Sequence, residues 1–412
     1  MAIPPWPACH KDSVLPLEGV RVVEFAHMVM GPSCGLALAD LGAEVIKVEP
    51  LAGDNTRRLE AAGAGFFPVF NRNKKSFAVD LQHPEGKKIV LRLLETADVL
   101  TENFRPGALD KLGFSYQALS QENPKLIYCS LKGFLKGPYD HRPALDEVTQ
   151  MMGGLAYMTG LPDRPLRAGS SVVDIMGGTF AALGILAALR ERERTGRGQE
   201  VTSALFESTA YLVAQHMAQY EITGEAPPPM SVKRPAWGVY DIFATAGGGR
   251  VFVGVVTDTQ WELFCKDFSL SDLAGDPRLD SNGKRVKERA WLIPRIGEVF
   301  RQYAETDLMK KLEAIGLPFA PIAKPWDLLE DPHLLASHGL LETKAGEKTI
   351  RVPALPLELG GRRLGKRSDP PRIGEHGREL LAGLGCSRQE IADLIEHGIV
   401  AIPKEEVTNG KE

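Results

Sequence analysis

The chain has 412 residues, of which 43% are hydrophobic and 25% charged, and its formal net charge at pH 7 is −4. This apolar fraction rules out global disorder, because enough surface can be buried to offset the entropy lost on folding. The slightly negative charge gives no electrostatic basis for nucleic-acid binding, and the length predicts two domains.

The N-terminal segment carries no recognisable targeting signal. Residues 1–13 contain three prolines but no basic stretch followed by an apolar one. The longest apolar stretch, residues 175–189, has 15 residues, which is too short for a bilayer, so we expect a buried helix and no membrane association. Scattered histidines and cysteines predict no metal site, no disulfide and a cytoplasmic protein; the cysteines are Cys9, Cys34, Cys129, Cys265 and Cys386.

The first half of the chain alternates between strand and helix patterns. A β-branched strand is predicted at residues 20–25, a turn at Gly31-Pro32, a helix at 33–41 and a second strand at 44–48. Strands connected by a helix form parallel sheets. We therefore predict an α/β large domain over residues 15–222, which continues with helices at 84–96, 106–112 and 179–194 and strands at 98–102, 126–131 and 199–203.

The pattern changes after the proline-rich residues 225–229, which we interpret as a linker. Two strand-like segments flank Gly247–Gly249, a sequence that predicts a hairpin turn rather than a phosphate-binding loop. We predict a smaller α+β domain at residues 230–335 and a C-terminal segment at 340–400; the predicted elements of the small domain are strands at 239–244 and 250–256 and helices at 259–268, 288–303 and 307–315.

The strand–helix–strand start raises the hypothesis of an α/β oxidoreductase. Glu49 ends the second strand, where a ribose-binding carboxylate stands in dinucleotide-binding folds. However, residues 26–35 lack Gly-x-Gly-x-x-Gly, and Pro32 removes a backbone donor that a phosphate would need. We therefore expect neither a nicotinamide nor a flavin cofactor.

Two other segments have both an ordinary and a functional interpretation. The basic residues 71–76 form either a solvated turn or a site for phosphates. Asp174 lies between apolar residues and precedes Gly177-Gly178, which we expect to open a helix. It is either a helix N-cap or a nucleophile, because a carboxylate can attack an activated acyl group such as a thioester.

The order and spacing of short motifs resemble the family III CoA-transferases, the group that includes formyl-CoA, carnitine and bile-acid CoA-transferases. The resemblance extends from Leu17 to about Leu381, and its specificity lies in the shared order of the motifs. The motifs are residues 17–25, His27, Gly31-Pro32, 41–49, Gly53-Asp54, 71–76, Asp80-Leu81, 102–107, Leu112-Gly113, Val173-Asp174, 195–199 and 374–376.

The resemblance implies a CoA-transferase with Asp174 as nucleophile and Asp146 as a supporting carboxylate. Asp174 would form a mixed anhydride with the acyl group, then an aspartyl-CoA thioester, and an acceptor acid would take the CoA through a second anhydride. The amides of Gly177 and Gly178 would stabilise the oxyanion. The implied CoA contacts are His27, Val29, Met30, Val79, Asp80, Leu81, Gln82, Asn103, Phe104, Arg105, Lys111, Arg142, Pro143, Ala144 and Leu145.

Some positions depart from the family pattern. Pro50 stands in place of a CoA-contacting arginine and Val29 in place of an active-site glutamine of formyl-CoA transferase, and residues 234–238 are not a glycine-rich loop. These departures argue against formate and oxalate as substrates. The 2-methylacyl-CoA racemases share the fold but use a His–Asp pair. Leu145 precedes Asp146 here and His141 lies four residues before Leu145, so the transferase is favoured over the racemase.

We expect the acceptor to be a small dicarboxylate or hydroxy acid. Arg57, Arg58, Arg167 and Arg234 are candidates to hold its second carboxylate, and a solvated surface arginine is the alternative for each. The resemblance also implies an interlocked homodimer. Its large domain would be Rossmann-like and built from the N- and C-terminal segments of the chain.

Overall fold

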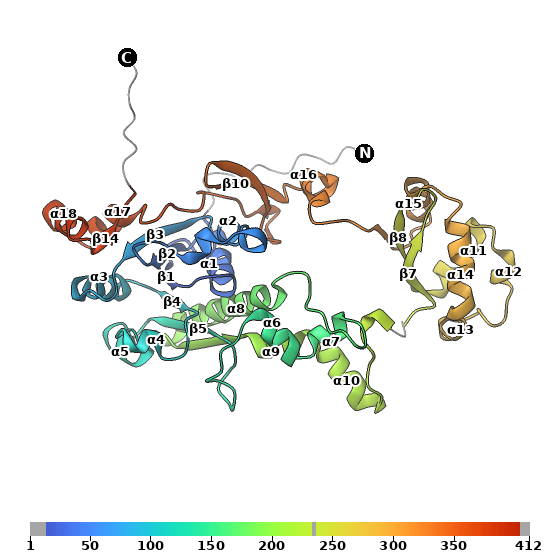
Figure 1. The fold of residues 1–412 in the computed structure, drawn as a ribbon, viewed down its shortest axis with the longest axis horizontal. Coiled ribbons are helices and arrows are strands. Elements are labelled where there is room, and N and C mark those ends of the chain that lie inside the picture. Colours follow the sequence, from blue (N-terminus) through green and yellow to red (C-terminus); the bar gives the residue numbers. More distant parts are fainter. Residues whose placement is uncertain (1–13, 233–235, 404–412) are drawn as a thin grey trace, which may run out of the picture. The chain divides into compact units, whose positions relative to one another are not determined.

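A seven-stranded sheet organises the larger part of the chain (Figure 1). The computed structural model describes residues 14–232 and 236–403. Strands β1 to β6 are parallel, and β14 is antiparallel to β3. Across the sheet the order is β14 (Val400–Ala401), β3 (Lys74–Val79), β2 (Glu44–Glu49), β1 (Arg21–Phe25), β4 (Val99–Glu102), β5 (Ile127–Lys132) and β6 (Glu200–Ala204).

The prediction of an α/β fold with a parallel sheet is confirmed. The order of β3, β2, β1, β4, β5 and β6 is that of dinucleotide-binding folds, in which the chain reverses direction across the sheet between β1 and β4. In such sheets, ligands bind outside the carboxyl ends of the strands at this switch point. The topology therefore predicts that a ligand binds near the residues that follow β1 and β4.

Both faces of the sheet are covered by helices. Consecutive strand residues point to opposite faces, so Val23 lies in one core with α3, α5, α17 and α18, and Val22 lies in the other with α1 and α8. The helices of this unit are α1 (Met30–Asp40), α2 (Phe66–Phe70), α3 (Pro84–Glu95), α4 (Ala108–Lys111), α5 (Tyr116–Glu122), α6 (Asp146–Met152), α7 (Leu155–Thr159), α8 (Val172–Thr195), α9 (Leu205–Leu212), α10 (Ala214–Thr223), α16 (Pro332–Ala336), α17 (Gly377–Gly383) and α18 (Arg388–Glu396).

Helix α8 begins earlier than the sequence predicts. We expected a helix from Thr179 opened by Gly177-Gly178, but both glycines lie inside α8. Here α8 crosses α1 closely: a Cβ on Gly177 would lie 2.5 Å from Met30 Cε, and one on Gly178 would lie 2.0 Å from Ser33 Oγ. The glycines thus permit helix packing, and because their amides lie within the helix ladder, the prediction that they form an oxyanion hole is wrong.

Among the described residues, one helix, α8, is long and apolar enough to cross a membrane. The 24-residue helix is longer than the 15-residue apolar stretch seen in the sequence. It contacts α1, β5 and β6. One such helix is weak evidence for a membrane span, and the packing gives it a place in the core of the large unit.

A compact unit spans Val232–Asp331, where the sequence predicted a domain at residues 230–335. The predicted hairpin is confirmed, because β7 (Val239–Ala244) pairs antiparallel with β8 (Arg250–Val255) and the connecting Gly247 and Gly248 have positive φ. The other elements of this unit are β9 (Phe319–Pro321), α11 (Asp258–Asp267), α12 (Ser271–Ala274), α13 (Asn282–Lys287), α14 (Arg289–Phe300) and α15 (Glu305–Ala314).

The C-terminal segment is part of the larger unit, because its strand β14 pairs with β3. Two short hairpins precede α17. Their strands are β10 (Leu340–Ala345), β11 (Lys348–Pro353), β12 (Glu358–Leu359) and β13 (Arg362–Arg363).

Candidate active site

Asp174 lies in the first turn of α8, and Asp146 is the first residue of α6. One oxygen of Asp146, Oδ2, accepts hydrogen bonds from the amides of Val173 at 2.9 Å and Asp174 at 3.2 Å. These are amides that the helix itself leaves unpaired. Asp146 therefore caps α8, and the alternative in which Asp174 is the N-cap is wrong, because the cap position is Ser171.

The second oxygen of Asp146 binds two side chains. Gln150 Nε2 donates to Oδ1 at 2.6 Å, and Arg167 Nη2 donates to it at 3.2 Å. Gln150 also accepts from the amide of Ala168 at 2.8 Å. The buried Asp146 thereby joins α6, the segment before α8 and the start of α8 into one rigid group.

This arrangement changes the acidity of Asp174. Burial and, to a smaller extent, the negative charge of Asp146 raise the pKa of the Asp174 carboxyl to about 7, against the opposing charge of the Arg167 guanidinium. A carboxyl with such a pKa is close to half ionised at neutral pH. It is more basic than an ordinary aspartate, and greater basicity favours nucleophilic attack.

The loop between β1 and α1 lies at the switch point of the sheet. His27 donates its amide to Asn103 Oδ1 at 3.1 Å, and Asn103 Nδ2 donates to the carbonyl of His27 at 2.8 Å. The His27 ring stacks on Phe104 with centroids 5.6 Å apart. Three predicted CoA contacts, one after β1 and two after β4, therefore form a single structure where a ligand is expected.

Met28 is held in a left-handed conformation, with φ of 63°. Its amide donates to Thr56 Oγ1 at 3.0 Å, and Asp54 in turn accepts from the amide and the hydroxyl of Thr56, each at 2.8 Å. Thr56 belongs to a short 3₁₀ helix, η1 (Asn55–Arg58). No motif connects Thr56 with Met28, and only the folded chain brings them together.

Met30 links this loop to α8. Its side chain packs against Gly177, one turn after Asp174, and its carbonyl lies against Gly178. Val29, also a predicted CoA contact, is buried beside it. The structure thus brings the β1–α1 loop and the start of α8 into contact.

The other predicted CoA-binding residues lie outside the β1–α1 loop and the start of α8. Val79 ends β3, Asp80 donates its amide to the carbonyl of Ile399, and Leu81 and Gln82 follow. Arg105 and Lys111 follow β4 and are exposed. The segment Arg142 to Leu145 follows β5 and precedes α6, with the Arg142 guanidinium 4.5 Å from the ring centroid of Tyr139. All of these segments follow carboxyl ends of parallel strands, which lie along one edge of the sheet.

The four candidate arginines have different surroundings. Arg57 donates through Nε and Nη2 to Glu49 and through Nη1 to the carbonyl of Pro371. Arg58 is exposed and donates to the carbonyl of Ala52 and to Asn55. Arg167 contacts Asp146, and Arg234 lies outside the described residues.

The basic residues 71–76 are neither a solvated turn nor a phosphate site, so both interpretations are wrong. Arg72 is buried against Asp40 at 2.6 Å, and Lys74 is buried against Glu24 at 2.8 Å. Charge runs usually face solvent, but these residues enter β3, which lies inside the sheet between β2 and β14. Their charges are neutralised inside the protein.

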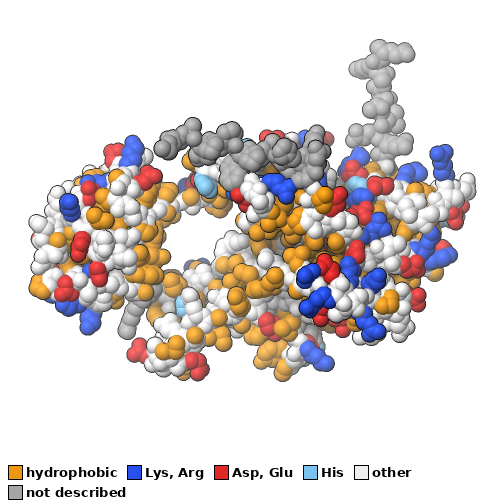
Figure 2. All heavy atoms as spheres, turned by 180° about the vertical axis from the view of Figure 1, so that it is seen from behind, with side chains coloured by type: hydrophobic (Ala, Val, Ile, Leu, Met, Phe, Trp, Pro, Cys, Tyr) orange, Lys and Arg blue, Asp and Glu red, His pale blue; other side chains and the backbone are white. Residues whose placement is uncertain are grey.

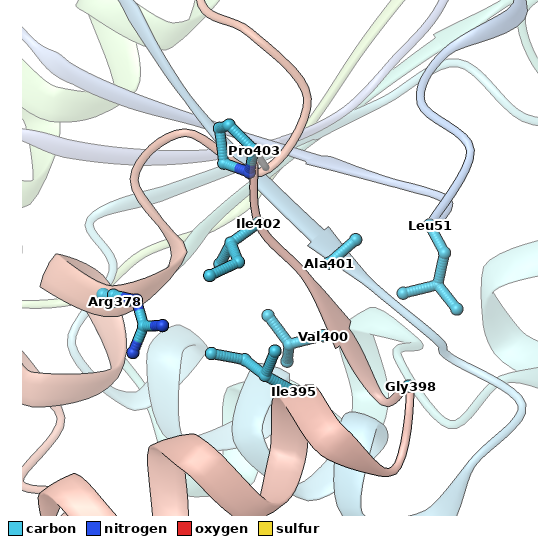
Figure 3. Close-up of a pocket in the computed structure, with 8 residues that line it drawn as sticks. All are labelled: Leu51, Arg378, Ile395, Gly398, Val400, Ala401, Ile402 and Pro403. Carbon is cyan, nitrogen blue, oxygen red and sulfur yellow. The ribbon is translucent and has the colours of Figure 1, made fainter. Parts of the chain in front are cut away.

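A hollow of about 570 Å³ lies against β14 (Figure 3), and neither Asp146 nor Asp174 lines it. Figure 3 shows apolar side chains of Ile395, Val400 and Ile402 gathered near Arg378. A second hollow of about 480 Å³ shares Ala401 and Ile402 with it. Arg57 lines the second hollow, but neither hollow is lined by Asp146, Asp174 or a predicted CoA contact, so the carboxylate geometry identifies the candidate active site.

Possible metal ligands do not gather in the described part of the chain, where no group of three or more histidine, cysteine or acidic side chains could hold an ion. His141 is 75% exposed and lies beside Asp140. Leu145 is the residue before α6 and is exposed, so the position where a racemase carries its histidine presents an aliphatic side chain.

Comparison with known proteins gives the family. The model of CoA-transferase family III matches residues 17–377. The chain is 35% identical to succinyl-CoA–D-citramalate CoA-transferase of Chloroflexus aurantiacus, over 92% of this chain and 96% of that protein. It is 34% identical to succinate–glutarate CoA-transferase of Agrobacterium fabrum, over 90% and 96%.

A solved structure agrees with these relatives. The crystal structure of a CAIB/BAIF family protein from Brucella suis is 35% identical, covers 90% of this chain and all of that chain, and superposes with a TM-score of 0.80. The chain therefore belongs to CoA-transferase family III and is a CoA-transferase.

Proposed function

We propose that this CoA-transferase moves CoA from a dicarboxylic acyl-CoA to a second small carboxylic acid, with Asp174 as the nucleophile. Several relatives are named for succinyl-CoA or succinate and for diacid partners such as citramalate and glutarate. The observation that carries the proposal is the position of Asp174. It stands in the first turn of α8, beside Asp146, on the helix that contacts the β1–α1 loop at the switch point.

The proposed reaction proceeds through alternating anhydrides and thioesters. The Asp174 carboxylate attacks the thioester carbonyl, the carbon–sulfur bond breaks, and a mixed anhydride and the CoA thiolate form. The thiolate then attacks the aspartyl carbonyl, which releases the donor acid and leaves an aspartyl-CoA thioester. The acceptor carboxylate attacks this thioester, its carbon–sulfur bond breaks, and a second anhydride and the CoA thiolate form. The returning thiolate attacks its acyl carbonyl, which yields the new acyl-CoA and free Asp174.

The surroundings of Asp174 suit this sequence. Its raised pKa makes the carboxylate a better nucleophile, while the dipole at the start of α8 and the Arg167 charge favour its ionised form. Asp146 fixes the first turn of α8 through two backbone hydrogen bonds, which holds the nucleophile in place.

Trapping of the covalent intermediate tests the proposal. The full-length protein is incubated with succinyl-CoA and hydroxylamine, and its peptides are examined by mass spectrometry. We expect a hydroxamate on Asp174, and Asp174→Asn should reduce CoA transfer by at least about 10³-fold. Asp163→Asn, which changes an exposed aspartate before the same helix, is the matched control and should retain activity. Full transfer by Asp174→Asn, or a hydroxamate on another residue only, would overturn the proposed mechanism.

We also propose that the protein is a homodimer. Figure 2 shows apolar side chains on the surface of the large unit. Helices α6 to α10 expose many of them, including Tyr211 at 69% and Ile222 at 83%. Soluble monomers rarely expose so many neighbouring apolar side chains, and a second copy of the chain would cover them. Light scattering should give twice the chain mass of 44.9 kDa, and a monomer at micromolar concentration would contradict the proposal.

A further inference from the structure

Arg167 has hydrogen-bond donors that the described part of the chain does not use. A guanidinium carries five N–H groups. Nη2 donates to Asp146 Oδ1 at 3.2 Å and to the carbonyl of Ser170 at 3.1 Å. Nε is buried and has no partner among the described residues. A buried donor without a partner costs about 1–3 kcal/mol, and Nη1 has no described hydrogen bond either, so the guanidinium keeps donors for a ligand that accepts hydrogen bonds.

The charges around Arg167 are also unbalanced. Asp146 and Asp174 supply two carboxylates, and Arg167 is the cation that acts on both. The guanidinium and the amide of Asp174 bind the two oxygens of the same Asp146 carboxylate. Arg167 is therefore one side chain removed from the nucleophile, and with 37% of its side chain exposed it can be reached by a substrate.

The other described candidates are less suited to hold a substrate carboxylate. Arg57 uses Nε, Nη1 and Nη2 within the protein. The two terminal nitrogens of Arg58 donate to Ala52 and Asn55 within its own loop. Neither has a described contact with Asp146 or Asp174, whereas Arg167 contacts Asp146 directly.

We propose that Arg167 binds the free carboxylate of a short dicarboxylic acyl group while the other end of that group is joined to Asp174. This inference rests on the proposed function, because it assumes that the acyl group becomes attached to Asp174. A second carboxylate brought near Asp146 would be repelled without a cation, and an arginine can hold two carboxylates through different edges of its planar fork. Arg167 would thus select diacids over monoacids of the same length.

Discrimination between succinate and butyrate as acceptors tests the proposal. These acids have the same number of carbons and differ in the second carboxylate. We expect Arg167→Met to lower kcat/KM for succinate by about 10- to 100-fold more than for butyrate, the loss typical of a hydrogen bond between charged groups. Arg167→Lys should restore part of the preference. Arg164→Met is the matched control, since Arg164 is exposed and lies three residues earlier.

The same measurements separate selection from positioning. If Arg167 acts only by orienting Asp146, Arg167→Met will lower kcat/KM for both acids equally, and the proposal is overturned. If wild-type protein does not use butyrate, inhibition constants of the two acids are compared instead, and loss of tighter succinate inhibition is the expected result. Absence of CoA transfer by wild-type protein with every diacid would refute the proposed function itself, which distinguishes the two failures.

Discussion

Two groups of acidic and basic side chains near the β1–α1 loop differ in how completely their charges are paired. The first, which we call the buried ion network, consists of Glu24, Lys47, Asp54 and Lys74. Lys74 lies 2.8 Å from Glu24, and Lys47 lies 2.9 Å from Asp54 and 3.7 Å from Glu24. The second is the site group, which consists of Asp146, Arg167 and Asp174.

The buried ion network contains two carboxylates and two ammonium groups, so its charges balance. Burial opposes ionisation of Asp54, but the Lys47 ammonium and the hydrogen bonds from Thr56 leave its pKa lowered. Lys47 also donates to the carbonyl of Ala26, and Lys74 to that of Pro32. The network therefore supports the loop structurally, although burial lowers the pKa of Lys74 to about 8 against the opposing charge of Glu24.

The site group contains two carboxylates and one guanidinium. Burial and the charge of Asp146 raise the pKa of Asp174, which is the opposite outcome to that at Asp54. The difference teaches that buried charges alone do not mark an active site. An active site is marked instead by charges that are incompletely paired beside an accessible carboxylate, because they leave both a reactive group and free hydrogen-bond donors for a substrate.

The largest effect is expected from breaking the balanced network. Lys74→Met should lower the free energy of unfolding by about 3–5 kcal/mol, because the buried Glu24 would lose its nearer cation and keep only Lys47, 3.7 Å away. Lys75→Met changes the next residue of β3, whose partners Glu44 and Glu379 are partly exposed, and should cost less than about 1 kcal/mol. Calorimetry of the full chain measures both. An equal loss of unfolding free energy in Lys74→Met and Lys75→Met would show that burial does not make the Lys74 ion pair more important than those of Lys75.

A smaller effect of opposite sign is expected in the site group. The pKa of Asp174 is raised from 3.8 to about 7, so ionisation of this residue destabilises the folded state. Asp174→Asn should therefore be more stable than wild type by an amount that grows between about pH 4 and pH 7 and then stays constant. Because the carboxylate is only partly buried, we expect about 1–3 kcal/mol at pH 8.

Melting temperatures measured from pH 5 to pH 8.5 check this second prediction. Glu147→Gln, a change of an exposed carboxylate on the first turn of α6, is the control and should show no such trend. A stability difference between Asp174→Asn and wild type that is independent of pH would mean that Asp174 has an ordinary pKa. The contrast between the two groups would then be lost.

Some features of the site were accessible from the sequence. The motif order identified Asp174, Asp146 and the residues after β1 and β4, and His27, Asn103 and Phe104 do lie together. The start of α8 was misplaced because glycines usually end or interrupt helices, whereas here they permit close contact with Met30 and Ser33. Gln150 belongs to no motif of the family, and its spacing of four residues from Asp146 on a helix is the signal in the sequence that points to their contact.

The sequence alone determined the alternation of strands and helices and the family, and it singled out Asp146 and Asp174 as candidates, because these inferences depend on residue type and local spacing. Only the tertiary structure decided which charges are balanced. Glu24 meets Lys74 across 50 residues, and Arg167 meets Asp146 across 21. Ion pairing and burial depend on distances between elements far apart in the chain, so the same kinds of side chain became a structural network in one place and a candidate active site in the other.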